Sequence, residues 1–189
     1  ISSMSQHTNT NIIAMADLFE DKLKTITPKL NQLNSAKGFP AIPPANILQG
    51  SKAYLKLLEL KDVDAVLISS PAYTHPTFME AAVAAGKHVY CEKPVATDAA
   101  GCKRIQQVGE RLNGKLSVVI GFQIRYATPY VEMVKRIQRA DIGELINAQL
   151  YYFSSGTKLH ELKNVPDDEF RIRNHYHFHA LSGGILLDQ

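Results

Sequence analysis

The stretch "DVDAVLISSPAYTHPTFMEAAVAAGKHVYCEKPVAT", residues 62–97, decides the fold class of this chain. Its first part is a β-branched apolar run that Pro71 stops. A segment opening with Thr-His-Pro and ending at Gly86 follows, and then comes "KHVYC", residues 87–91, which ends in the apolar run Val89–Cys91. Threonine and proline at the start and glycine at the end are typical of a helix. The stretch therefore predicts a strand, a helix and a second strand.

The same alternation continues on both sides of this stretch. The strands are apolar throughout rather than at every second position, which is typical of a parallel sheet covered by helices on both faces. We therefore predict a doubly wound α/β domain over residues 1–122. The further elements expected are strands at 11–16 and 116–122, helices at 18–34 (kinked or split by Pro28), 54–60 and 97–112 (capped by Thr97), and a loop at 35–50 with a short strand near residue 47.

After Phe122 the pattern changes. An amphipathic helix is expected at 129–139, and the apolar run "ELINAQLYYFS", residues 144–154, predicts a long strand. We interpret residues 123–189 as the opening part of a second, α+β domain.

Composition excludes several classes of protein. The 189 residues are 45% hydrophobic and 21% charged, with a net charge of +3 and no basic block, so neither a nucleic-acid nor a membrane partner is expected. Cys91 and Cys102 are too few for a disulfide framework or a four-ligand zinc site. The chain does not begin with Met and shows no signal peptide, so we expect a piece of a longer protein. Its compartment is predicted to be the cytoplasm, with the periplasm as the alternative.

Polar residues follow two of the predicted strands directly. Residues 69–71 (Ser-Ser-Pro) and His75 follow one strand, and Glu92 and Lys93 follow the next. Ligands of open α/β sheets bind outside the carboxyl ends of the strands, and a lysine there can orient a reacting hydroxyl or take part in proton transfer. An ordinary strand exit with solvated charges is the alternative.

Asp17 ends the first predicted strand. In a dinucleotide-binding fold, an acid at the end of the second strand accepts hydrogen bonds from the adenosine ribose, and its charge repels a 2′-phosphate. This position favours NAD over NADP, while a loop aspartate before a helix is the alternative. The glycine-rich turn of such a fold would lie upstream of residue 1.

His175, His177 and His179 alternate in "NHYHFHAL". On a strand the three imidazoles would share one face and suggest a metal. No carboxylate or cysteine stands at close ligand spacing, so we predict no metal site and favour substrate contact or plain surface.

Three segments resemble one known family. Residues 62–97, "GFQIRYATPYVEMVKRIQRADIGEL" and "LSGGILLDQ" are similar to the Gfo/Idh/MocA oxidoreductases, named after glucose–fructose oxidoreductase, inositol dehydrogenase and MocA. The resemblance implies a Rossmann-type first domain, bound NAD, and association into a homo-oligomer when the protein is full length.

The resemblance also implies roles for individual residues. Lys93 would be the catalytic lysine and Asp188 the second catalytic position, while the family's histidine would fall beyond Gln189. The implied cofactor contacts are Asp17, Ser69, Ser70, Pro71, His75, Glu92, Lys93 and Gln123, and the implied substrate contacts are Arg125 and Tyr126. To the substrate contacts we add His175.

The function predicted from these residues is hydride transfer between nicotinamide and a hydroxyl-bearing carbon of a sugar, polyol or related compound. Two alternatives remain: an NAD-dependent glycoside hydrolase that uses transient oxidation, and a non-catalytic sugar or dinucleotide binder. Lys93 in an intact Glu-Lys-Pro favours net redox chemistry over hydrolysis.

Overall fold

The computed structural model describes residues 6–112, 114–153 and 155–184. The chain forms two compact units. The first comprises residues up to Leu67, Thr77–Val89 and Val108–Val118, and the second comprises Ile68–Pro76, Tyr90–Gln107 and the residues from Val119 onward. The domain boundary at residue 122 stays a prediction.

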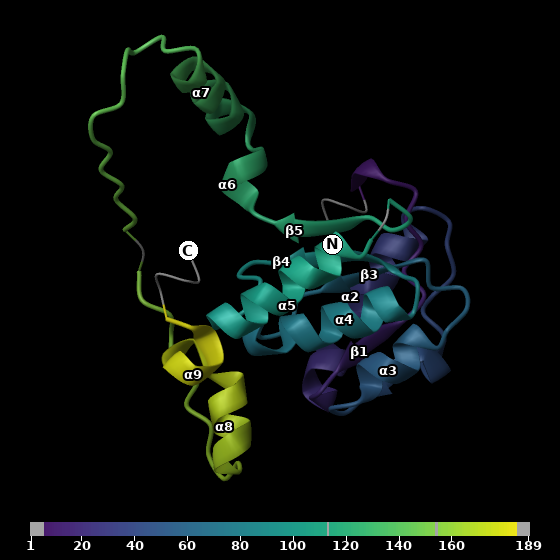
Figure 1. The fold of residues 1–189 in the computed structure, drawn as a ribbon. Coiled ribbons are helices and arrows are strands. Elements are labelled where there is room, and N and C mark those ends of the chain that lie inside the picture. Colours follow the sequence, from purple (N-terminus) through teal and green to yellow (C-terminus); the bar gives the residue numbers. More distant parts are fainter. Residues whose placement is uncertain (1–5, 113, 154, 185–189) are drawn as a thin grey trace. The chain divides into compact units, whose positions relative to one another are not determined.

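The first unit is built on a parallel pair of short strands. β1 (Met15–Asp17) pairs with β2 (Ile47–Gln49), so that Asp17 lies opposite Gln49. Helices α2 (Glu20–Ser35) and α3 (Ala53–Leu58) both contact β1 (Figure 1). Both predicted strands are present, although β1 is shorter than expected and includes Asp17. A 3₁₀ turn, η1 (Pro44–Asn46), precedes β2.

Pro28 lies inside α2 without dividing it. Leu23 and Leu30, one on each side of the proline, are both buried. Packing of these side chains holds the two halves in one helix although the proline removes a backbone donor.

Three further strands form a second sheet in the order β3 (Ala65–Ile68), β4 (His88–Glu92), β5 (Val118–Gly121). Helix α4 (His75–Ala84) connects β3 to β4, and helix α5 (Ala99–Glu110) connects β4 to β5. The predicted strand–helix alternation is therefore present.

The start of α5 corrects one prediction. Asp98, rather than Thr97, caps the helix, because its Oδ1 accepts a hydrogen bond of 2.6 Å from the backbone N–H of Gly101. A carboxylate at this position satisfies one of the first-turn donors that have no partner inside the helix.

The chain beyond β5 is mostly helical and irregular. Two helices, α6 (Gln123–Tyr126) and α7 (Thr128–Gln138), are followed by a long irregular path, drawn in green in Figure 1. The path leads to α8 (Asp167–Arg173), a 3₁₀ turn η3 (His175–His177) and α9 (His179–Ser182). Among the described residues, no helix is long and apolar enough to span a bilayer.

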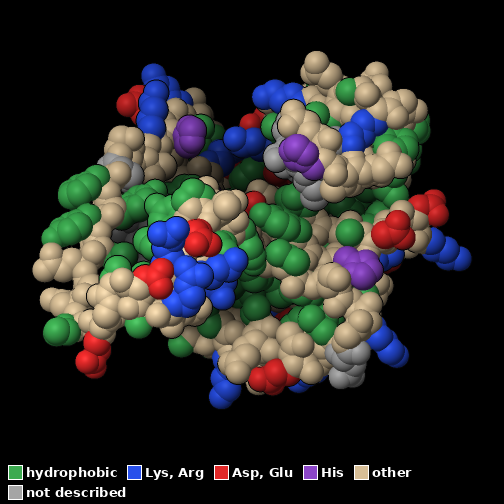
Figure 2. All heavy atoms as spheres, turned by 90° about the horizontal axis from the view of Figure 1, so that it is seen from above, with side chains coloured by type: hydrophobic (Ala, Val, Ile, Leu, Met, Phe, Trp, Pro, Cys, Tyr) green, Lys and Arg blue, Asp and Glu red, His purple; other side chains and the backbone are tan. Residues whose placement is uncertain are grey.

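The strand predicted at 144–154 is absent over residues 144–153, which have no regular secondary structure. Ile146 and Leu150 are 95% and 96% exposed. Figure 2 shows hydrophobic side chains at the surface on the face it presents. A strand is stable only when a neighbour satisfies its backbone groups, and no described strand pairs with this segment. The apolar run alone could not supply that partner.

Candidate active site at the strand ends

The loop that follows β3 is held by its own hydroxyl groups. Thr74 Oγ1 donates to the carbonyl oxygen of Pro71 at 2.8 Å, so Ser70 Oγ must be the donor in its 2.6 Å contact with Thr74 Oγ1. These bonds close a 3₁₀ turn, η2 (Ala72–Thr74). The Ser70 hydroxyl is thereby committed to the loop, whereas Ser69 is exposed.

The loop that follows β4 begins with Glu92 and Lys93, both half-buried. Pro94 is buried, and the Lys93–Pro94 peptide bond is cis. The two charged residues thus stand where strand β4 meets a buried proline.

His75 joins these two loops. Its Nδ1 lies 2.7 Å from the carbonyl oxygen of Pro94, and its Nε2 lies 2.7 Å from the carbonyl oxygen of Ser70. The side chain is 1% exposed. Sequence reasoning predicted His75 as a cofactor contact, and the structure places its ring between the loops.

Gly121, at the end of β5, allows two β4 side chains to come close. A Cβ atom on Gly121 would lie 2.5 Å from Tyr90 Oη and 3.1 Å from Glu92 Oε2. Tyr90 and Glu92 are two apart on one strand and so share a face. Sequence reasoning missed Tyr90, although its spacing from Glu92 was the available signal.

The pKa of the Tyr90 hydroxyl is raised, first by desolvation and then by the negative charge of Glu92 and by Tyr126. Tyr90 therefore stays a neutral hydroxyl that can both donate and accept hydrogen bonds. Tyr126 is 60% exposed, and the other predicted residues of α6, Gln123 and Arg125, are exposed as well. Helix α6 thus presents polar side chains directly after β5.

Cys91 lies between Tyr90 and Glu92 but points to the opposite side of the strand. It is fully buried, and burial together with the Glu92 charge raises the pKa of its thiol to about 12. A thiol in this state is a packed side chain rather than a nucleophile.

Asp17 belongs to the first unit, at the carboxyl end of β1. Its Oδ1 accepts a hydrogen bond of 2.8 Å from the backbone N–H of Phe19, which orients the half-buried carboxylate. A carboxylate in this place is chemically suited to accept hydrogen bonds from a ribose diol. The residues present therefore fit an adenine dinucleotide at this strand end.

His175 lies on η3, and its Nδ1 is 3.2 Å from the carbonyl oxygen of Ile172. The three alternating histidines lie on η3 and α9 rather than on a strand, and the described part of the chain contains no group of three His, Cys, Asp or Glu residues that could hold a metal. Helix α9 contacts η2, the turn that precedes His75. Asp188, the second predicted catalytic residue, lies outside the described residues.

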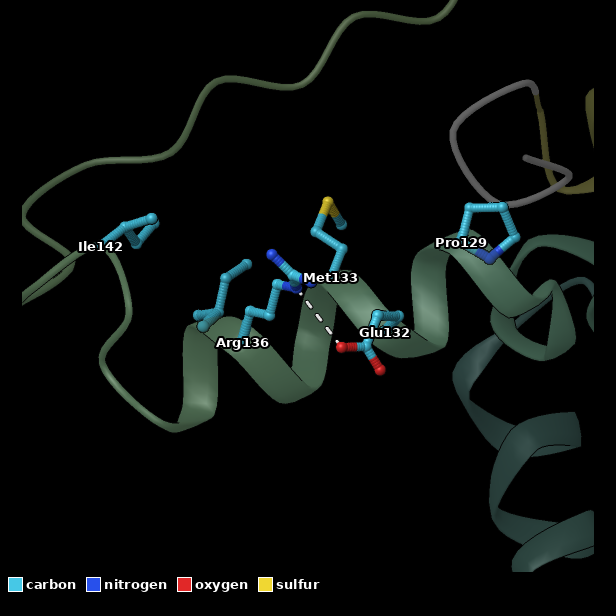
Figure 3. Close-up of a pocket in the computed structure, with 6 residues that line it drawn as sticks. Pro129, Glu132, Met133, Arg136 and Ile142 are labelled. Atoms are coloured by element: carbon cyan, nitrogen blue, oxygen red, sulfur yellow. Dashed lines mark hydrogen bonds and ion pairs between the residues drawn. The ribbon is translucent and has the colours of Figure 1, made fainter.

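An open hollow of about 460 Å³ lies elsewhere in the second unit, on α7 and the turn after it (Figure 3). Arg136 Nε donates to Glu132 Oε1 at 3.3 Å beside it. None of the predicted site residues lines this hollow. Its lining residues are Pro129, Glu132, Met133, Arg136, Ile137 and Ile142.

Comparison with known proteins agrees with the resemblance seen in the sequence. The family model described as "Oxidoreductase family, NAD-binding Rossmann fold" matches residues 6–120. Inositol 2-dehydrogenase from Acidothermus cellulolyticus is 34% identical over 140 residues, which make up 74% of this chain and 36% of that protein.

Solved structures of the same fold are also similar. Scyllo-inositol dehydrogenase from Lactobacillus casei, with bound NAD(H) and scyllo-inositol, superposes with a TM-score of 0.57 at 23% identity, over 76% of this chain and 38% of that one. KijD10, a 3-ketoreductase from Actinomadura kijaniata in complex with TDP-benzene and NADP, gives a TM-score of 0.52 at 27% identity, over 75% and 39%. These likenesses confirm the predicted Rossmann-type α/β fold. The chain spans little more than a third of the length of these proteins.

Proposed function

This chain belongs to the oxidoreductase family with an NAD-binding Rossmann fold, and from that premise we propose that the full-length protein is a dehydrogenase. It transfers a hydride between nicotinamide and a hydroxyl-bearing carbon of a polyol or sugar. NAD is the cofactor of the family, and Asp17 supports NAD over NADP here because its carboxylate would repel a 2′-phosphate. Inositols are the first substrates to test, since two of the three proteins reported above are inositol dehydrogenases by name.

One observation carries the proposal. His75 holds the loop after β3 and the loop after β4 together through two contacts of 2.7 Å, and Glu92 and Lys93 stand at the start of the second loop. An amino group and a carboxylate on the two residues that end β4 and open this loop, at the edge where ligands of parallel sheets bind, suit the handling of a hydroxyl group.

The proposed roles follow from the chemistry of each side chain. NAD, when bound, supplies the hydride acceptor. Lys93 hydrogen-bonds the reacting hydroxyl, and its ammonium stabilises the negative charge that grows on the oxygen as the proton leaves. Asp188 orients the substrate or the base that takes this proton. The cofactor is lined by Ser69, Ser70, Pro71, Glu92 and Gln123, and the substrate is contacted by Arg125, Tyr126 and His175.

A substrate screen tests the proposal. Full-length protein is incubated with inositols, other polyols and sugars, each with NAD and separately with NADP, and the absorbance of the reduced cofactor is followed. We expect at least one polyol to give one reduced cofactor per molecule oxidised, faster with NAD. Glycoside cleavage without accumulation of NADH would instead identify a hydrolase, and no reaction with any compound would contradict dehydrogenase activity on this class.

We further propose that the full-length protein is a cytoplasmic homo-oligomer. The exposed apolar side chains of residues 144–153 support association, because a large exposed apolar surface is typical of an interface. Light scattering of the full-length protein measures the mass. A monomer at all concentrations would contradict this proposal.

A further inference from the structure

We propose that His75 is a positioning residue: its ring ties Pro94 to Ser70 and thereby fixes the position of Lys93 for the proposed dehydrogenase reaction, on which this inference rests. The role is separate from direct contact with cofactor or substrate, because the imidazole ring is buried.

The bond pattern is specific. Both partners of the ring are backbone carbonyl oxygens, each 2.7 Å from a ring nitrogen. A carbonyl oxygen only accepts, so each contact is a hydrogen bond when that nitrogen carries a proton. The ring spans two loops that lie 24 residues apart in sequence, at Ser70 and Pro94.

Both ends of this link are themselves fixed. On one side, the Ser70–Thr74 hydroxyl contact and the Thr74–Pro71 hydrogen bond hold the loop after β3. On the other side, Pro94 is buried, and its ring restricts the backbone directly after Lys93. Lys93 is therefore constrained by strand β4 before it and by a clamped residue after it.

Position matters because the proposed reaction needs the Lys93 amino group within hydrogen-bond distance of one hydroxyl. A shift of about 1 Å in a catalytic group costs about 10²-fold in rate. Loss of the Pro94 bond should therefore lower kcat, while loss of the Ser70 bond should act mainly on the loop after β3.

Two substitutions separate the bonds. In His75→Asn the side-chain amide can occupy the place of Nδ1, so it can still donate to Pro94 but not reach Ser70. In His75→Gln the amide can occupy the place of Nε2, so it can donate to Ser70 and leaves Pro94 without this bond. His88→Asn, at the exposed start of β4, is the matched control.

The first measurement is the kinetics of the full-length variants on the polyol found in the screen. We expect His75→Gln to lower kcat about 10²-fold and His75→Asn to lower it about tenfold or less, with any loss of NAD affinity no larger than about tenfold, because both loops are also proposed to line the cofactor. Equal losses of kcat in both variants, or no loss in either, would overturn the positioning role.

The second measurement does not depend on activity. Amide hydrogen exchange should speed up in residues 92–96 of His75→Gln and in residues 69–73 of His75→Asn, with His88→Asn unchanged in both. If this pattern appears in a protein that oxidises no polyol, the role of His75 in holding the two loops is supported and the proposed function is contradicted. If exchange is unchanged in both loops, the proposal that His75 holds them in place is wrong.

Discussion

Asn34 in the first unit and His75 in the second are both buried polar side chains, each 1% exposed, and both bond to backbone from separate stretches. Asn34 Oδ1 accepts from the N–H of Ile12, and Nδ2 donates to the carbonyl oxygens of Ile12 and Pro40. These partners lie before β1 and after α2, and neither of them is a predicted site residue. The partners of His75 lie beside predicted site residues.

The same feature, a buried polar side chain that hydrogen-bonds separate backbone segments, serves two purposes in this chain. A buried side chain that satisfies backbone groups makes their separation costly wherever it occurs. Around Asn34 that cost appears as stability of the first unit. Around His75 we propose that it holds Lys93 in place after β4. Substitution of Asn34 should therefore lower the free energy of unfolding, whereas substitution of His75 should lower kcat.

The largest effect should come from Lys93→Ala, which removes the amino group whose position His75 is proposed to fix. We expect kcat to fall about 10³-fold or more, because the stabilised oxygen charge is lost, with NAD affinity within about threefold of wild type. Steady-state kinetics and NADH fluorescence titration measure the two quantities.

Lys103→Ala, at an exposed position of α5, serves as the control and should behave like wild type. Turnover that survives in Lys93→Ala would show that the catalytic assignment of Lys93 is wrong.

The next largest effect is expected from Asn34→Leu, which removes the side-chain hydrogen bonds from Asn34 to Ile12 and Pro40. One backbone donor and two carbonyl oxygens lose their partner; Ile12 is half-buried and Pro40 is exposed, so the free energy of unfolding should fall by about 2 kcal/mol. Urea denaturation of the full-length protein measures it, with Gln32→Leu on the exposed face of α2 as the control. A loss no larger than that of the control would contradict the anchoring role, and so would a fall in kcat without a fall in stability.

A smaller effect is expected from Gly121→Ala. The new methyl group would lie 2.5 Å from Tyr90 Oη, so Tyr90 and Glu92 must move apart from β5. Tyr90 Oη and Glu92 Oε2 are both far ends of side chains that can turn away, so the fold should tolerate the change, while the displaced Glu92, proposed to line the cofactor, should weaken NAD binding about tenfold. Titration of NADH fluorescence tests this.

Tyr90→Ala should partly restore binding in Gly121→Ala, because it removes the clashing hydroxyl. Additive losses in the double variant would contradict a clash between these two positions.

The smallest effect concerns pH and Cys91. Burial raises the pKa of this thiol to about 12, from about 9, so the folded protein holds it neutral while the unfolded chain ionises it above about 9. The stabilisation is complete below about pH 9 and is lost as pH rises toward about 12. By about pH 10 wild type should lose about 1 kcal/mol more than Cys91→Ala does. Denaturation at several pH values measures the difference, and parallel curves would contradict it.

Much of this fold could be predicted from local pattern, because the sequence signals of strands and helices lie within a few neighbouring residues. Apolar runs with Pro71 and Gly86 at their ends placed β3, α4 and β4 correctly. The position of Glu92 and Lys93 at a strand end followed from the same pattern.

Features that depend on contacts distant in sequence could not be predicted. The ring of His75 reaches Pro94, 19 residues away, and nothing near His75 reveals that contact. The approach of Tyr90 to Gly121 depends in the same way on how two strands lie side by side. The strand expected at 144–154 is absent over residues 144–153 for a related reason: an apolar run shows a tendency to form a strand but does not supply a pairing partner.

The exposed path through residues 144–153 has a practical consequence for anyone who handles this chain. Proteases bind their substrates as extended backbone, and this segment already has irregular, exposed backbone. Leu150, Tyr151, Tyr152 and Phe153 provide the large apolar side chains that chymotrypsin-type enzymes prefer. A brief digestion should therefore cut here first and separate a fragment ending near α7 from one that contains α8 and α9.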